Sequence, residues 1–170
     1  MSTRHAVVET TLGPITIVAT GKAITGLYFA RHIRRPDGET LGPRVHTSED
    51  QLLMEAGRQL IEYLDRSRRT FDLPLAAAGD AFQKRVWAIV SEIPFGQTFT
   101  YGAIAALLGD RTLAQDVGQA VGANPLCIFV PCHRVVGATG ALIGYAGGLN
   151  RKRALLELEE PAAVAAGRLF

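Results

Sequence analysis

A cysteine, a histidine and an arginine follow one another at the end of an apolar run, in the stretch IFVPCHRVVG at 128–137. A thiolate is a nucleophile, and nearby cations or hydrogen-bond donors lower the pKa of a thiol. Histidine is the side chain best matched to accept that proton at neutral pH. Because neighbours in the chain cannot easily point at one another, we expect any link between Cys132 and His133 to run through a water molecule.

Two other interpretations of this triplet compete with a nucleophile. Structural zinc takes four protein ligands, whereas Cys127, Cys132 and His133 form no Cys-x-x-Cys pair and no second cluster supplies the rest, so no metal is expected. Cys127 lies inside the apolar run and is expected to be a small buried hydrophobe. From the residues alone, Cys132 stays open between a structural and a nucleophilic role.

Length and composition describe an ordinary globular chain. Its 170 residues can build one sizeable core or two small ones, and 48% are hydrophobic and 20% charged. A net charge of +2 neither requires nor excludes nucleic acid, and the arginine clusters at 31–35, 66–69 and 150–153 are compatible with solvated loops. No apolar run approaches the roughly 20 residues that span a bilayer. With two closely spaced cysteines and no secretion signal, we expect a reduced, cytoplasmic location without a membrane.

The first half carries β patterns followed by one helical pattern. β-branched runs over residues 1–30 are broken at 12–14 and 21–22, which predicts hairpin turns, and residues 31–47 predict a surface loop. Helical spacing extends from Ser48, the expected cap, to about Arg66. A strand is predicted at 70–75. The small residues at 76–80 mark a boundary between an N-terminal β-rich structural domain, 1–78, and a C-terminal domain, 79–170.

The second half is predicted to be mostly helical. Asp80 and Gln83 are spaced as a capping box for a helix that ends before Pro94. Thr100 starts a short helix that Gly109 can close in the left-handed conformation. Another helix is expected from 112 to about 122. Two short helices joined by 109–111 have the layout of a helix-turn-helix, but the same spacing also suits a plain packing unit.

The last third is predicted to deliver the cysteine and then to close the domain. LCIFVP at 126–131 predicts a short buried strand with Cys132 exposed at its end. A glycine-rich loop follows, and Asn150 can cap a last helix over 151–160.

Two segments resemble the O6-alkylguanine-DNA alkyltransferases. These are FQKRVWAIVSEIPFGQTFTYGAIAALLG in the second half, and ANP followed by PCHRVVG and GYAGGLNRKRALLELE. The resemblance covers residues 80–160, and PCHRV with GYxGGLxxK is highly specific. The first 75 residues match only in general plan. The resemblance implies an α/β (α+β) fold, in which a small β-rich ribonuclease-H-like domain precedes a mostly helical, winged-helix-like domain with a helix-turn-helix.

The resemblance also implies DNA repair by a single, irreversible transfer. The damaged base would be flipped out of double-stranded DNA, and Cys132 would take the alkyl group from O6 of guanine, or from O4 of thymine, without any cofactor. His133 would be the water-linked base and Glu159 its partner, with Asn124 as a hinge and Lys152 near the leaving guanine. Arg134 is expected to be a structural ion-pair partner. The implied pocket residues are Tyr101, Cys132, Val135, Tyr145 and Ala146.

The helix implied to contact DNA departs from the family pattern. Its implied contacts are Tyr101, Arg111, Ala114, Gln115 and Gly118, but family members usually carry an intercalating arginine where this chain has Gln115, and Asp116 follows it. A neutral amide next to a carboxylate predicts weakened or altered duplex recognition. Arg111 could reach the base stack instead, and Gln115 could merely complete a capping box with Thr112.

Two rival functions remain at this point. A non-catalytic alkyl-lesion-binding protein of the alkyltransferase-like type would replace the nucleophile, typically with tryptophan, whereas this chain keeps Cys132. A cysteine-dependent hydrolase would need an oxyanion site and a turnover step, of which the sequence shows no sign. No sign of oligomerisation is present either, so a monomer is expected.

Overall fold

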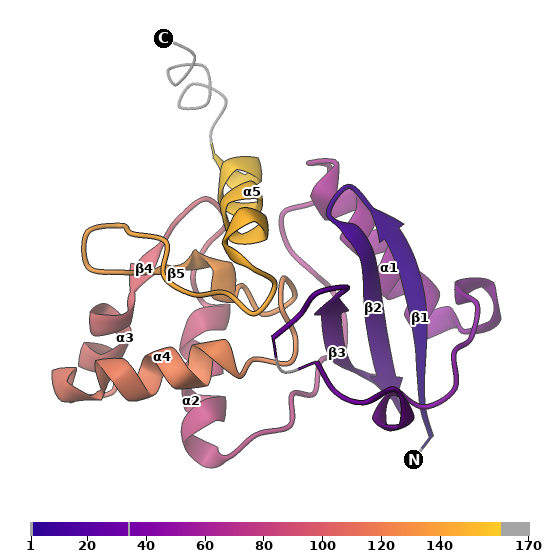
Figure 1. The fold of residues 1–170 in the computed structure, drawn as a ribbon, viewed down its shortest axis with the longest axis horizontal. Helices are drawn as coiled ribbons and strands as arrows, with labels where there is room; N and C mark the ends of the chain where they lie inside the picture. Colours follow the sequence, from indigo (N-terminus) through magenta and orange to yellow (C-terminus); the bar gives the residue numbers. More distant parts are fainter. Residues whose placement is uncertain (1, 34, 161–170) are drawn as a thin grey trace, which may run out of the picture.

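A three-stranded sheet forms the N-terminal part of the molecule (Figure 1). The computed structural model describes residues 2–33 and 35–160. β1 (Thr3–Thr10), β2 (Gly13–Thr20) and β3 (Ala23–Phe29) pair antiparallel in the order β1-β2-β3. Gly13 and Gly21 have φ of 91° and 60°, in the left-handed region that favours glycine. Both predicted hairpin turns are therefore confirmed.

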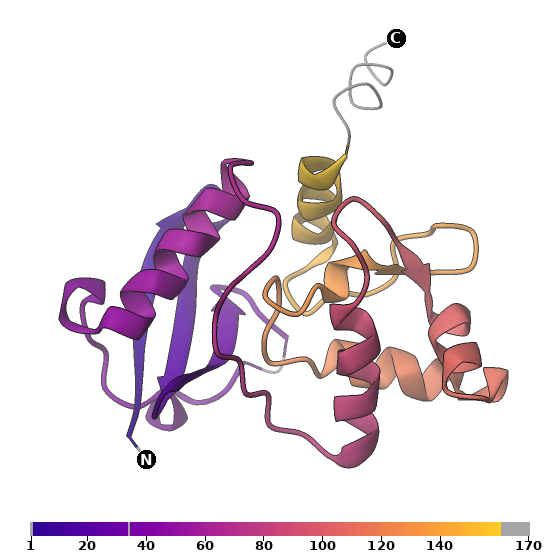
Figure 2. The ribbon, with the colours of Figure 1, turned by 180° about the vertical axis from the view of Figure 1, so that it is seen from behind.

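Helix α1 (Gln51–Leu64) covers one face of this sheet, as the view from behind shows (Figure 2). Its first turn is capped by Asp50, whose carboxylate accepts from the Leu53 amide at 3.0 Å. The predicted cap, Ser48, is wrong, because it lies in a short 3₁₀ helix, Thr47–Glu49. The preceding loop is also less open than expected, since it contains another 3₁₀ helix, Gly38–Leu41, in which Leu41 is buried.

The segment predicted as a strand at 70–75 is not one. It runs along β3 and forms only a single bridge, between Leu75 and Ile24. The Ile24 amide donates to the Pro74 carbonyl at 2.7 Å, but Pro74 has no amide hydrogen to return. A regular ladder therefore cannot continue through this position.

The C-terminal part contains four α-helices among the described residues, which lie beside the sheet domain in Figures 1 and 2. They are α2 (Ala81–Ser91), α3 (Tyr101–Leu107), α4 (Ala114–Gly122) and α5 (Leu149–Glu159). The Asp80–Gln83 capping box and the Thr100 cap both form as predicted. Two short strands, β4 (Phe99–Thr100) and β5 (Val135–Val136), pair in parallel within this part.

Helices α3 and α4 pack against each other in the predicted helix-turn-helix order. Gly109, with φ of 94°, follows α3 as expected. The predicted start of α4 at Thr112 is wrong, because Asp110 accepts from the Thr112 amide and holds a 3₁₀ turn, Arg111–Leu113, ahead of the helix. No side chain caps α4, so Gln115 does not complete a capping box with Thr112.

The chain from 126 to 131 turns back on itself instead of forming the predicted strand. Ile128 has φ of 74°, which no extended strand allows, and the Val130 amide donates to the Leu126 carbonyl at 2.8 Å. The loop is fastened to the edge of β3, where the Leu27 amide donates to the Pro125 carbonyl at 2.8 Å. Cys127 is buried in the loop, as expected.

Helix α5 closes the fold. Its cap is Gly148, so the predicted cap Asn150 is wrong and lies within the first turn. Leu155 is fully buried, and Leu156 and Leu158 are half-buried. One continuous core cluster contains side chains from both parts of the chain. The division at 78/79 stays a prediction, and residues 161–170 of the second domain lie outside the described residues. Within 2–33 and 35–160, no helix is long and apolar enough to cross a membrane.

Candidate active site

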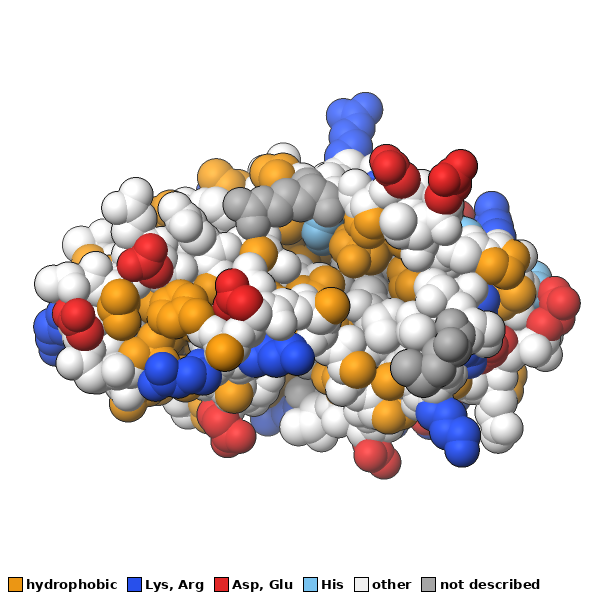
Figure 3. Space-filling view, turned by 90° about the horizontal axis from the view of Figure 1, so that it is seen from below, with side chains coloured by type: hydrophobic (Ala, Val, Ile, Leu, Met, Phe, Trp, Pro, Cys, Tyr) orange, Lys and Arg blue, Asp and Glu red, His pale blue; other side chains and the backbone are white. Residues whose placement is uncertain are grey.

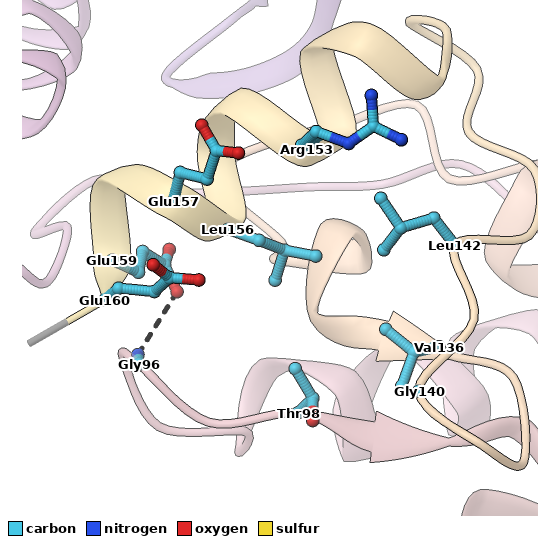
Figure 4. A pocket seen from close by; sticks show the side chains of 10 residues that line it. All are labelled: Gly96, Thr98, Val136, Gly140, Leu142, Arg153, Leu156, Glu157, Glu159 and Glu160. Carbon is cyan, nitrogen blue, oxygen red and sulfur yellow. Dashed lines mark hydrogen bonds between the residues drawn. The ribbon is translucent and has the colours of Figure 1, made fainter. Parts of the chain in front are cut away.

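The carboxylate of Glu159, at the end of α5, is the centre of a buried network. It accepts from His133 Nε2 at 2.7 Å and from Arg134 Nε and Nη2 at 2.8 and 2.9 Å. The Tyr63 hydroxyl donates to it at 2.5 Å, and the Gly96 amide at 3.2 Å, the bond drawn in Figure 4. The Glu159 side chain is only 1% exposed. Its full set of donors compensates for the burial of its charge.

These donors determine the protonation of the network. Burial opposes ionisation of Glu159, but hydrogen bonds from His133, Arg134 and Tyr63 hold its pKa at about 2. Burial lowers the pKa of His133, so the imidazole is neutral at pH 7. Because an ionised carboxylate only accepts, we assign the His133 proton to Nε2, which leaves the Nδ1 lone pair free. Nδ1 has no hydrogen-bond partner within the described part of the chain. This nitrogen can therefore accept a proton.

Arg134 is a structural ion-pair partner, as predicted. Besides its two bonds to Glu159, its Nη1 donates to the Ile93 carbonyl at 2.7 Å. The guanidinium therefore links the end of α5 to the segment after α2.

Cys132 begins a short 3₁₀ helix, Cys132–Arg134, and lies at the wall of a cavity of about 580 Å³. The predicted exposure of its side chain is wrong, because it is only 4% exposed. The loop that turns at Ile128 buries the thiol, and Cys132 contributes to the lining of this cavity. Residues from five separate segments line this space: Ile33, Tyr101, Ala114, Gln115, Gly118, Gln119, Val121, Gly122, Cys132, Ile143, Gly144, Tyr145 and Ala146.

The surroundings of Cys132 favour its thiolate. A hydrogen bond with Cys127 lowers its pKa most, burial opposes this, and the Asn124 side chain and the Lys152 charge lower it further. Asn124 also shapes the loop, because its amide donates to the Val130 carbonyl at 3.0 Å while its oxygen accepts from the Leu126 amide at 2.9 Å. Several neighbouring groups therefore favour the reactive thiolate form of Cys132.

Two side chains hold the 143–146 loop that forms the opposite wall. Lys152 Nζ donates to the carbonyls of Ile143 and Gly144 at 3.0 and 3.1 Å, and the Tyr101 hydroxyl donates to Ile143 at 3.0 Å. Burial lowers the pKa of Lys152 to about 8, so the ammonium form is still the larger fraction at pH 7. Tyr101 lines the cavity, whereas Lys152 lies behind the wall that this loop forms.

The comparisons with known proteins identify the family of this chain. The model of the 6-O-methylguanine DNA methyltransferase DNA-binding domain matches residues 81–161, and that of its ribonuclease-like domain matches residues 3–77. The chain belongs to this family. A methylated-DNA–protein-cysteine methyltransferase of Mycobacterium tuberculosis is 41% identical over 98% of both chains, and one of Methanosarcina acetivorans is 39% identical over 91% of this chain and 97% of that protein.

Solved structures of the family share the fold over nearly the whole chain. The M. tuberculosis O6-methylguanine methyltransferase superposes with a TM-score of 0.82 at 37% identity, over 97% of this chain and 99% of that one. The M. tuberculosis OGT in complex with DNA gives a TM-score of 0.81 at 38% identity, over 95% and 98% of the two chains. The expected combination of a small sheet domain and a helical domain is confirmed.

The structure brings together most residues that the sequence singled out. Seven of them line the cavity: Tyr101, Ala114, Gln115, Gly118, Cys132, Tyr145 and Ala146. His133, Glu159, Asn124 and Lys152 lie behind its wall, in the contacts described above. Val135 does not line the cavity, because it is fully buried in β5 opposite Phe99. Arg111 is exposed in the turn before α4 and does not line it either.

Among the contributors that sequence reasoning missed, three matter most for the chemistry and the shape of the site. Tyr63 donates to Glu159 from α1, far away in the chain, and no motif distinguishes it from an ordinary core tyrosine. Ile33 comes from the loop after β3 and is 63% exposed at the cavity rim, where its amide donates to the Ala146 carbonyl at 2.8 Å. Cys127 was expected to be buried, which is confirmed, but its contact with Cys132 was not foreseen.

A second cavity, of about 400 Å³, has Glu159 among the residues that line it (Figure 4). Gly96, Leu142, Arg153 and Leu156 help to line it, and the thiol of Cys132 is not part of it. On the face seen in Figure 3, acidic and basic side chains are interspersed, and neither sign of charge dominates. No group of three or more potential metal ligands occurs within residues 2–33 and 35–160.

Proposed function

We propose that this protein repairs alkylated DNA by transferring the alkyl group from O6 of guanine to its own Cys132. The observation that carries the proposal is the position of the Cys132 thiol, at the wall of a 580 Å³ cavity and directly before the buried His133–Glu159 pair. Family membership supports the same reaction, since the relatives are named methylated-DNA–protein-cysteine methyltransferases.

The reaction begins with a proton transfer. The Cys132 thiol gives its proton, through a water molecule, to the free Nδ1 of His133. The imidazolium that forms is stabilised by the Glu159 carboxylate, which already accepts from Nε2 at 2.7 Å. Arg134 and Tyr63 keep that carboxylate ionised and in place. The buried network therefore acts through His133 on the thiol.

The thiolate then attacks the alkyl carbon. A carbon–sulfur bond forms while the bond between that carbon and guanine O6 breaks, and the electron pair stays on the guanine oxygen. Tyr101, which lines the cavity, and Lys152, directly behind its wall, supply hydrogen bonds or a proton to the leaving guanine. The S-alkyl cysteine is stable, so each molecule acts once. The same transfer from O4 of thymine is part of the proposal.

DNA approaches along α4, the second helix of the helix-turn-helix. Gln115, Gly118 and Gln119 lie on one face of α4 and line the cavity, so a nucleotide flipped out beside this helix enters next to Cys132. We propose double-stranded DNA as the partner, a monomer as the active form, and a cytoplasmic location. No metal or other cofactor takes part in the proposed steps.

Intact-protein mass spectrometry after incubation with O6-methylguanine duplex DNA tests the proposal. We expect a stable gain of one methyl group on the wild-type protein and none on Cys132→Ser. Cys127→Ser serves as the matched thiol control and should still gain the group. Tight binding to the lesion without any adduct would contradict transfer and support a lesion-binding protein instead, and continuous turnover of a substrate would support a hydrolase.

A further inference from the structure

Cys132 has a second thiol beside it. Cys127 Sγ lies 3.7 Å from Cys132 Sγ, a hydrogen-bonding distance for two sulfur atoms. Both thiols are free, and their side chains are 1% and 4% exposed. Cys132 lines the active-site cavity whereas Cys127 does not, so Cys127 lies on the protein side of the nucleophile.

The loop is bent in a way that creates this contact. In an extended strand, residues five apart would be separated by about 16 Å and would point to opposite faces. Here Ile128, a β-branched residue, has φ of 74°. Such a conformation is strained for a β-branched residue and persists only where the surroundings hold it. Asn124 does so, through its bonds to Leu126 and Val130.

The hydrogen bonds form a short chain while both thiols are protonated. The Cys132 S–H donates to Cys127 Sγ, and the Cys127 S–H donates to the Asn124 carbonyl at 3.9 Å. When Cys132 loses its proton, its sulfur becomes an acceptor only. Rotation about one bond then turns the Cys127 S–H from the Asn124 carbonyl to that sulfur.

Cys127 keeps its own proton during this change. Its hydrogen bond with Cys132, and then its burial, hold the pKa of Cys127 well above the usual range. The other groups that influence the Cys132 sulfur are the Asn124 amide, the Lys152 ammonium, the hydroxyls of Tyr101 and Tyr145, and the His133 imidazole, which takes its proton through water in the proposed function. Burial raises the pKa of both tyrosines, so they stay neutral. Cys127 is thus one donor among several around the thiolate.

We propose that Cys127 is a positioning residue, whose thiol donates to the Cys132 thiolate and increases the fraction of the nucleophile that is ready to react. The proposal rests on the nucleophilic role of Cys132 in the proposed function. In this role, Cys127 touches neither DNA nor the alkyl group.

The pH dependence of Cys132 reactivity tests the proposal without DNA. Iodoacetamide labels the thiolate, and peptide mass spectrometry assigns the label to Cys132 in wild type, Cys127→Ser and Cys127→Ala between about pH 5 and 10. We expect alanine to move the midpoint upward by about one unit, which slows labelling about tenfold near pH 7, whereas serine, which still donates, stays within about threefold of wild type. Cys127→Val gives a second apolar replacement if alanine does not fold.

Val86→Ala is the matched control, because Val86 is fully buried in α2 and is not among the residues that line the cavity. It should lower the melting temperature without moving the labelling midpoint. Superimposed profiles for alanine and wild type would overturn the proposal, as would equal shifts for serine and alanine. If wild type labels as expected but gains no alkyl group from duplex DNA, the proposed function fails while the thiol contact stands.

Discussion

At the inner end of the active-site cavity, Cys132 is followed by a network in which the side chains are buried and the Glu159 carboxylate accepts from several donors. The outer rim is built from exposed or half-buried side chains on α4 and two loops, including Gln115 and Ile33. Removing a partner from the inner network leaves an uncompensated buried group, whereas a change at the rim is absorbed by water. Substitutions in the inner network, which serves the chemistry, should therefore cost more than substitutions at the rim, which serves recognition. The following variants test this contrast.

The largest effect is expected for Glu159→Gln. The substitution leaves the Arg134 guanidinium buried without its charge partner, which costs about 3–5 kcal/mol of unfolding free energy. It also removes the charge that stabilises protonated His133, so single-turnover alkyl transfer should fall at least about a hundredfold. Urea unfolding and rapid-quench kinetics measure the two effects. Glu157→Gln, on an exposed position of the same helix, should change stability by less than about 0.5 kcal/mol. Equal losses for both variants would contradict the claim that the buried contacts of Glu159 stabilise the fold and support the transfer.

Acid should weaken the inner network in a defined range. The folded-state pKa of Glu159 is about 2, below its ordinary value of 4.5, so its contribution is complete above pH 4.5 and is lost as the pH falls toward 2. This shift corresponds to about 3 kcal/mol. The stability difference between wild type and Glu159→Gln should therefore shrink between pH 4.5 and 2. Other carboxylates with a lowered pKa, such as Asp50, are present in both proteins, so their contributions to the pH dependence cancel in this difference. A difference independent of pH would show that the Glu159 charge is not the cause.

A smaller effect in the opposite direction is expected at the rim. Gln115→Arg adds a charged donor beside the cavity and should accelerate transfer from duplex DNA about fivefold, because hydrogen bonds to charged groups are about 1 kcal/mol stronger. Single-turnover rates on duplex DNA and on the free base separate recognition from chemistry, and only the former should change. Gln119→Arg, exposed one turn further along the same cavity, is the control. An equal gain for Gln119→Arg would show that the added charge, and not its position at residue 115, causes the acceleration.

The smallest effect is expected for Asp116→Asn. Asp116 is exposed in the first turn of α4, and removing its repulsion of phosphate should tighten duplex binding about two- to threefold at low salt. The gain should disappear at high salt. Glu9→Gln makes the same change of charge on an exposed position of β1 and should leave binding unchanged. Fluorescence anisotropy with a labelled duplex measures both variants, and equal gains for the two would exclude a local role for Asp116.

Local signals predicted the helices well and the irregular segments poorly. The Asp80–Gln83 box and the Thr100 cap form as the spacing indicates, since their hydrogen bonds join residues three positions apart. Apolar runs at 70–75 and 126–131 were expected to be strands. Pro74 lacks the donor that a ladder needs, and the left-handed Ile128 reverses the second run. A run of apolar residues indicates burial, but it does not determine the backbone conformation.

By itself, the sequence determined the hairpins, the two helices capped by Asp80 and Thr100, and the chemical character of the Cys-His-Arg triplet, because each depends on residues that are close in the chain. Only the tertiary structure decided that Tyr63 from α1 meets Glu159 from α5, and that Cys127 meets Cys132 across a reversed loop. It also decided that Ile33 borders the cavity and that Val135 does not. These contacts depend on the reversed loop at Ile128 and on how the sheet packs against the helices, where distances between side chains no longer follow from their spacing in the sequence.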